Sequence, residues 1–181
     1  MLSEGERWTG DMMLGRRRGQ AAHEPVAAIA AALVWNTPLP EEASFEHLCA
    51  AVSEIYGRRL VFAETDAPLR ATTGVLFEAK TFTGIIVATQ DSDYYSFLSR
   101  LHELCHLLVR SAPATWFPPG TTRPRQPDPE SRMFLRLCPR NSSESGDAES
   151  VREELIVEEM ARMFTRRFTT YADTTEEEHF G

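Results

Sequence analysis

The chain has 181 residues, of which 42% are hydrophobic and 25% are charged, and its formal net charge at pH 7 is -8. This length is enough for one domain with a proper core and is short for two. The acidic balance argues against a nucleic-acid-binding surface as the main feature, so we expect no direct contact with DNA or RNA. The one basic cluster, residues 16–18, is interpreted as a solvated run.

Cysteine usage and hydropathy indicate the cellular setting. The three cysteines are odd in number and widely spaced, which is not the pattern of a disulfide framework and favours a reducing cytoplasm. The apolar run 25–35 is too short to span a bilayer, and no signal peptide is visible. We therefore expect a cytoplasmic protein that does not cross a membrane.

The first part of the chain is predicted to be helical after a flexible arm over residues 1–20. Residues 21–35 are rich in alanine, the strongest helix former. Residues 44–57 begin with Ser44, a suitable N-cap, repeat apolar side chains at helical spacing and end at Gly57. Both segments are therefore predicted as helices.

Three strands are predicted next, at residues 58–64, 73–82 and 84–90. These segments are rich in valine, isoleucine, phenylalanine and threonine, the residues that favour strands. Only a short turn around Thr83 and Gly84 separates the last two segments. We therefore expect them to form a hairpin.

Two further helices are predicted, separated by a long insertion. The first covers residues 94–110 and is capped by Ser92 or Asp93. The insertion, residues 111–149, holds seven of the eleven prolines, and within it only 131–139 is able to form a helical turn or a short strand. The last helix covers residues 147–168, and an acidic tail over 169–181 follows it.

His102, Glu103 and His106 form the pattern H-E-x-x-H on the first of these two helices. Side chains four residues apart share a helix face, so the two imidazoles can bind one metal ion, for which zinc is the default. Glu103 lies about 100° around the helix from His102, where its carboxylate can transfer protons beside the metal. The alternative is that both histidines are buried side chains bonded to backbone or carboxylate groups.

The third metal ligand is expected on the last helix. Glu158 shares a helix face with Ala161, Phe164 and Phe168, and a single carboxylate on an apolar face points into the protein. Glu158 is therefore the first choice and Glu154 the second. The alternative is a solvated acidic face made by all four glutamates at positions 153, 154, 158 and 159.

These segments resemble the ImmA/IrrE-like metallopeptidases, which are bacterial and phage gluzincins. The resemblance covers roughly residues 44–110 and 150–168 and is carried by "SFEHLCAAVSEIYGRRLVFAE", "TGVLFEAKTFTGIIVATQ", "SFLSRLHELCHLLV" and "EEMARMF". It implies a zincin-like α+β domain over 21–168, with a small three-stranded sheet packed on the motif helix and on a C-terminal helix that supplies the glutamate ligand. It also implies zinc bound by His102, His106 and Glu158, with Glu103 as the catalytic base.

The chain departs from the usual family pattern at two positions. Cys105 stands where family members have glycine, as a small buried residue, a spare ligand or a redox-sensitive point. Arg162 stands where related enzymes have an asparagine or aspartate that can orient a metal-binding histidine. A cation cannot accept a hydrogen bond from an imidazole N–H, so this position bears on catalysis.

Two functions are considered for this sequence. The first is a zinc-dependent endopeptidase of narrow specificity that cleaves a protein substrate, by analogy a helix-turn-helix repressor or an antitoxin-like regulator of a bacterial toxin–antitoxin system. The second is a regulatory or toxin-type partner protein that keeps zinc as a structural clamp and acts by binding. Glu103 favours the enzyme, because a structural site does not need it, and Arg162 favours the binding protein.

Overall fold

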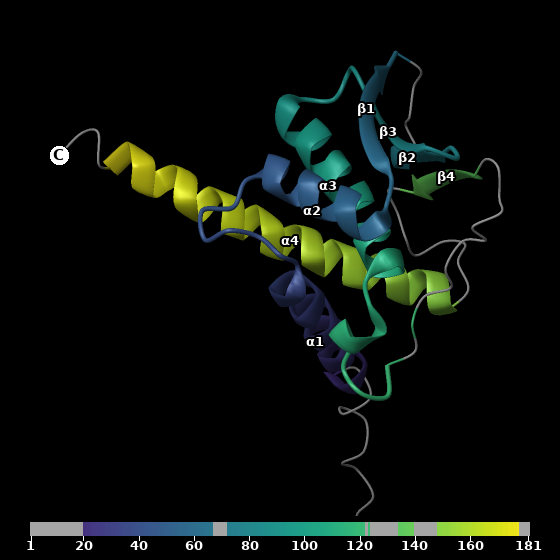
Figure 1. Ribbon diagram of the computed structural model, residues 1–181, viewed down its shortest axis with the longest axis vertical. Helices are drawn as coiled ribbons and strands as arrows, with labels where there is room; N and C mark the ends of the chain where they lie inside the picture. Colours follow the sequence, from purple (N-terminus) through teal and green to yellow (C-terminus); the bar gives the residue numbers. More distant parts are fainter. Residues whose placement is uncertain (1–19, 67–71, 122, 124–133, 140–147, 178–181) are drawn as a thin grey trace, which may run out of the picture.

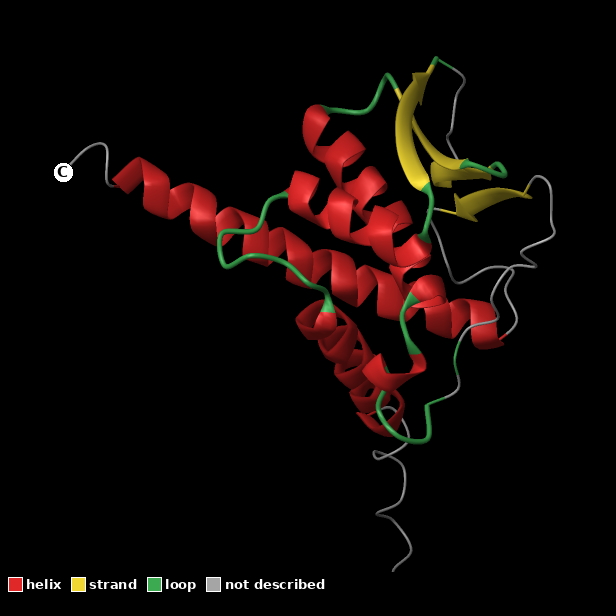
Figure 2. Ribbon diagram, viewed as in Figure 1, coloured by secondary structure: helices red, strands yellow, loops and turns green. Residues whose placement is uncertain are grey.

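The helices and strands of the protein are given by a computed structural model, which describes residues 20–66, 72–121, 123, 134–139 and 148–177. In chain order the elements are α1 (Gln20–Asn36), α2 (Phe45–Tyr56), β1 (Arg59–Thr65), β2 (Thr72–Glu78), β3 (Phe82–Ala88), α3 (Asp93–Ser111), the short 3₁₀ helix η1 (Ala114–Trp116), β4 (Phe134–Pro139) and α4 (Ala148–Glu177). The helices gather beside one small sheet (Figures 1 and 2). This arrangement confirms the predicted α+β class.

The sheet has four strands in the order β1-β3-β2-β4, not the three that were predicted. β1 is parallel to β3, and β2 is antiparallel to both β3 and β4. The fourth strand comes from the insertion, where a short apolar run fits a strand or a helical turn equally well by sequence. Pairing with β2, which is distant in sequence, decides in favour of the strand.

The β2–β3 hairpin is present, but its turn lies earlier than predicted. The backbone N–H of Ala79 donates to the carbonyl of Phe82 over 2.9 Å, which places the turn at residues 79–81. Thr83 and Gly84 lie inside β3, opposite Glu78 and Phe77. Thr83 is fully buried, so its polarity is not a sign of an exposed turn.

The predicted helix ends hold for α2 and for the start of α3, because they depend on local hydrogen bonds. The Ser44 hydroxyl accepts from the backbone N–H of His47, and Gly57 ends α2 with a φ of 73°, a backbone conformation that favours glycine. Ser92 caps α3 in the same way. α4 runs on to Glu177, past the predicted end at residue 168. Of the expected arm over residues 1–20, residues 1–19 lie outside the described residues, and Gln20 is the first residue of α1.

The core lies where α3 packs against the sheet on one side and against α4 on the other. Contacts join α3 to β2, β3, α2 and α4, and α1 packs along α4 (Figure 1). Fully buried side chains at this junction include Leu101, Leu104, Leu107, Met160 and Phe164. Each contributes about 1.5–3 kcal/mol of transfer free energy, and together they fix the relative position of α3 and α4.

No helix in the described part of the chain is both long enough and apolar enough to cross a membrane.

Candidate metal centre

His102 and His106 lie one turn apart on α3, as their spacing predicts. Their Nε2 atoms are 3.1 Å apart, and their ring planes make an angle of 75°. His106 is fully buried, while the side chain of His102 is 13% exposed. Two imidazole nitrogens therefore converge on one point, and His102 is the member that solvent can reach.

The carboxylate that meets both histidines belongs to Glu154. Its Oε2 atom lies 3.3 Å from Nε2 of His102 and 3.3 Å from Nε2 of His106. The three residues form a cluster whose ligand atoms all lie within 4.8 Å of one another, so it can hold a metal ion. Glu154, the second choice from the sequence, thus lies where Glu158, the first choice, was expected.

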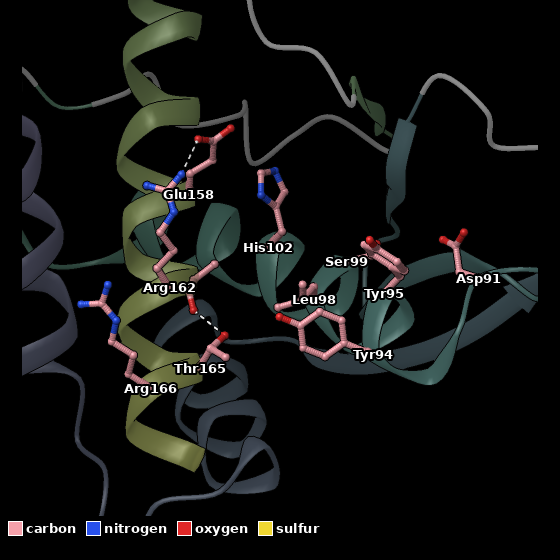
Figure 3. A pocket seen from close by; sticks show the side chains of 11 residues that line it. Asp91, Tyr94, Tyr95, Leu98, Ser99, His102, Glu158, Arg162, Thr165 and Arg166 are labelled. Atoms are coloured by element: carbon pink, nitrogen blue, oxygen red, sulfur yellow. Dashed lines mark hydrogen bonds and ion pairs between the residues drawn. The ribbon is translucent and has the colours of Figure 1, made fainter. Parts of the chain in front are cut away.

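Glu158 lies outside this cluster, and its assignment as the third ligand is corrected. Its side chain is 40% exposed, and its Oε2 atom is 3.4 Å from Nη2 of Arg162 (Figure 3). The buried stripe of α4 runs through Glu153, Val157 and Phe164, so it is rotated from the face that the sequence suggested. Glu158 is four residues, about 6 Å, beyond Glu154 along the helix, beside the cluster and not in it.

Glu153 and Arg110 support the cluster from behind, a role that the sequence did not reveal. Oε1 of Glu153 lies 2.8 Å from Nδ1 of His106, and it accepts a hydrogen bond from Nε of Arg110 over 3.0 Å. A carboxylate on Nδ1 fixes the imidazole tautomer and leaves the Nε2 lone pair for a metal. The sequence did contain a usable signal. Arg110 follows His106 by four residues at the end of an apolar run, where it is expected to be buried. A buried cation needs a partner of opposite charge.

Arg162 does not occupy the position that orients a metal-binding histidine. It is exposed and lies within 3.4 Å and 3.1 Å of the carboxylates of Glu158 and Glu159. The partner on the far side of His106 is the carboxylate of Glu153. The departure from the family pattern at Arg162 therefore does not deprive His106 of an acceptor.

Glu103 is fully buried between α3 and the sheet. It lies against Gly74 of β2, where an added Cβ would be 3.1 Å from Oε1 and 3.2 Å from Cγ of Glu103. Such distances are tighter than most Cβ contacts in proteins. The absence of a side chain at Gly74 therefore makes room for the Glu103 carboxylate.

Cys105 behaves as a small core residue. Its side chain is fully buried in the hydrophobic core. Burial, and secondly the nearby charge of Glu103, raises the pKa of the Cys105 thiol. The thiol therefore stays protonated, which is unfavourable for metal binding and for oxidation.

The charge of Glu154 is set by two opposing effects. Burial disfavours its ionised form, but hydrogen bonds from His102 and His106, together with their charge when protonated, outweigh burial and lower the pKa of the Glu154 carboxyl. The carboxylate is therefore ionised over the whole physiological pH range. An ionised carboxylate is the form that binds a cation.

A cleft of about 560 Å³ opens beside His102, between α3 and α4 (Figure 3). Tyr94, Tyr95 and Leu98 of α3 line one wall, and Ala161 and Arg162 belong to the α4 wall. Each tyrosine is 60% exposed. The cleft gives molecules from solvent a route to the histidine at the edge of the cluster.

The spacing of the three ligand atoms fits a tetrahedral ion. Nitrogen and oxygen donors bound at about 2.0–2.1 Å in a tetrahedral site are about 3.3–3.4 Å apart, close to the 3.1, 3.3 and 3.3 Å between the three ligand atoms. With neutral imidazoles, the buried groups Glu103, Glu153, Glu154 and Arg110 have formal charges that sum to a double negative charge. A divalent cation would neutralise this charge, and several first-row ions suit such donors.

No family model, curated protein or solved structure matches this chain significantly. The function is therefore inferred from the geometry of the site.

Proposed function

We propose that this protein is a zinc-dependent endopeptidase, with His102, His106 and Glu154 as the metal ligands and Glu103 as the general base. The observation that carries the proposal is the triangle of two imidazole nitrogens and one carboxylate oxygen with sides of 3.1–3.3 Å. It lies beside a cleft that reaches His102. Glu103 follows His102 directly in the chain, so it lies on the same helix, α3, and its side chain is fully buried.

The number of ligands favours a catalytic site over a structural one. Structural zinc sites usually have four protein ligands, whereas catalytic sites have three and keep one position for water or substrate. In the described part of the chain the cluster contains three residues of ligand type. The partial exposure of His102 agrees with an accessible fourth position.

The residues of the chain have separate parts in peptide hydrolysis. When bound, zinc polarises a carbonyl oxygen and lowers the pKa of a water molecule. Glu103 accepts a proton from the attacking water and passes it to the leaving amine. Glu153 holds the imidazole of His106 through Nδ1, so that Nε2 keeps its direction during the reaction.

The cleft suits a protein substrate. Tyrosine and arginine are enriched at protein contact surfaces, and both occur at this cleft as Tyr94, Tyr95 and Arg162 beside the apolar Leu98. By the family resemblance, the substrate would be a helix-turn-helix repressor or an antitoxin-like regulator.

The second candidate function is that of a zinc-stabilised partner protein that binds without cleavage. The exposed Tyr94 and Tyr95 favour it, because a docking surface needs such side chains and no chemistry. Glu103 opposes it, because burial of a carboxylate is costly and a clamp between two helices gains nothing from it. The enzyme is the stronger proposal for this reason.

One experiment separates the two functions. Zinc content and cleavage of candidate repressors would be measured for the wild type, for Glu103→Gln and for the control Glu158→Gln. We expect full zinc in all three proteins and loss of cleavage only in Glu103→Gln. Zinc without cleavage in the wild type, with retained binding of a repressor, would favour the partner protein, and a wild type that binds no divalent metal would refute both.

A further inference from the structure

We propose that Arg110 is a positioning residue, which prepares His106 for the metal through Glu153. Arg110 is joined to His106 through Oε1 of Glu153, the oxygen that both side chains meet. The inference rests on the proposed metal site and adds a residue that the H-E-x-x-H pattern does not include.

The geometry joins three buried groups in a row. The guanidinium Nε of Arg110 is 3.0 Å from Oε1 of Glu153, and the same oxygen is 2.8 Å from Nδ1 of His106. The side chains of Arg110, Glu153 and His106 are 8%, 9% and 0% exposed. Because solvent hardly reaches them, the direction of each hydrogen bond is set by the protein.

Arg110 acts by holding the carboxylate of Glu153 in place. The Nε–H of Arg110 donates to Oε1 of Glu153, the same oxygen that faces Nδ1 of His106. The planar guanidinium keeps its donors in a fixed geometry, so it fixes the position of this oxygen. A carboxylate oxygen held on Nδ1 sets the orientation of the imidazole ring.

This arrangement orients His106 before a metal arrives. With Oε1 of Glu153 on Nδ1, the other ring nitrogen, Nε2, points at the cluster, 3.1 Å from Nε2 of His102 and 3.3 Å from Oε2 of Glu154. A ring that is already oriented does not have to rearrange when an ion binds. Arg110 should therefore increase metal affinity although it is not a ligand.

The competing explanation is that Arg110 only stabilises the fold. It lies in the last turn of α3, where a cation interacts favourably with the helix dipole. In that case its loss would lower stability without an effect specific to the metal. The two explanations differ in whether Arg110 acts through Glu153.

The test is a double-mutant cycle read out as zinc affinity. The proteins are the wild type, Arg110→Met, Glu153→Gln, the double variant and, as a control, Arg162→Met, which removes an exposed arginine paired with other carboxylates. Zinc dissociation constants are measured by competition with a chelator on protein shown to be folded by circular dichroism. Since outer partners of metal ligands typically change affinity by about 10–100-fold, we expect roughly tenfold weaker binding for Arg110→Met and no change for the control.

In the Glu153→Gln background, Arg110→Met should cause no further loss of zinc affinity, because the carboxylate through which Arg110 acts on His106 is absent. Equal losses in both backgrounds, or unchanged affinity in folded Arg110→Met, would overturn the proposal. If Arg110→Met does not fold, Arg110→Lys replaces it, with an intermediate loss expected and unchanged affinity counting against the proposal.

A second measurement does not depend on zinc. Proton NMR of the metal-free protein should show the Nδ1–H proton of His106 protected from exchange with water in the wild type and less protected in the Arg110 variant. Equal protection in both proteins would reject the role of Arg110. A wild type with a protected Nδ1–H but no affinity for zinc would instead reject the proposed function and leave the Arg110–Glu153–His106 relationship in place.

Discussion

Gly74 lies against Glu103, so closely that a Cβ on this glycine would be 3.1 Å from the Oε1 atom of the carboxylate. The same Cβ would be 3.3 Å from the carbonyl oxygen of Ile86 on the neighbouring strand, so it could not move away easily. The sheet therefore forms one wall of the space in which Glu103 sits. A change in β2 can thus act on the proposed general base without touching the metal ligands.

Gly74→Ala should impair cleavage and leave zinc binding unchanged. The added methyl group must displace Glu103 by a few tenths of an ångström, and misplacement of a catalytic group by about 1 Å can lower the rate about 100-fold. Steady-state kinetics and zinc titration of the variant measure the two effects. Gly84→Ala is the matched control, because its Cβ would meet Phe77 at an ordinary 3.7 Å; equal losses in both variants would contradict the role given to Gly74.

Glu154→Ala should abolish tight metal binding, whereas Glu158→Ala should leave it intact. Glu154 contributes the oxygen 3.3 Å from both imidazoles, while Glu158 is exposed and paired with Arg162. Removal of a ligand should weaken zinc binding by more than the roughly 10–100-fold that outer partners cause. Calorimetric zinc titration of both variants tests the assignment, and the reverse result would return the ligand role to Glu158.

Cys49 and Cys105 should resist alkylation in the folded protein at pH 8. Burial, and then the charge of Glu46, raises the pKa of Cys49 to about 12, and burial also raises the pKa of Cys105. Only the thiolate reacts readily, so labelling should require unfolding. Mass spectrometry in a Cys138→Ser background follows these two thiols, and fast labelling of Cys105 in folded protein would show that it is accessible.

The same shift predicts how stability changes in alkaline solution. A raised pKa means that folded Cys49 keeps its proton where the unfolded thiol, with its ordinary value near 9, loses it. The contribution of Cys49 to the free energy of unfolding is therefore intact below pH 9 and decreases as the pH rises from there towards 12. Denaturant unfolding of the wild type and of Cys49→Ala at pH 7.5 and 10 should show a smaller alkaline loss in the variant.

Phe164→Ala should destabilise the protein by about 3–5 kcal/mol, the usual cost of removing a large buried aromatic side chain. Phe164 is fully buried where α4 meets the core. Phe168, stacked on it with ring centroids 6.0 Å apart, is only partly buried. Phe168→Ala is therefore the control with the smaller expected loss, and denaturant unfolding of both variants measures the difference.

The sequence predicted the features that depend on neighbouring residues. Ser44, Gly57 and Ser92 set helix ends through bonds within four residues, and the spacing of His102 and His106 is a property of a single helix. Each of these predictions holds.

The features that the sequence did not predict depend on contacts between distant segments. Glu154 and Glu158 differ by only about 40° around α4, and the choice between them is made by how α4 packs on α3. The same packing brings Glu153 to Arg110. β4 forms by pairing with the edge of β2. A local sequence pattern cannot reveal a pairing partner so distant in the chain.

The bonds that join α3 to α4 at the cluster connect residues 43 and 47 positions apart, and β4 lies in the segment between them. The site therefore cannot assemble until a loop of this length has closed, a step with a substantial entropic cost. We expect the contacts that depend on this closure to form after the folding transition state, and such contacts mainly retard unfolding and do little to accelerate folding. An ion held between α3 and α4 would consequently prolong the lifetime of the native state, so that a chelator should shorten this lifetime without a matching effect on the rate of refolding.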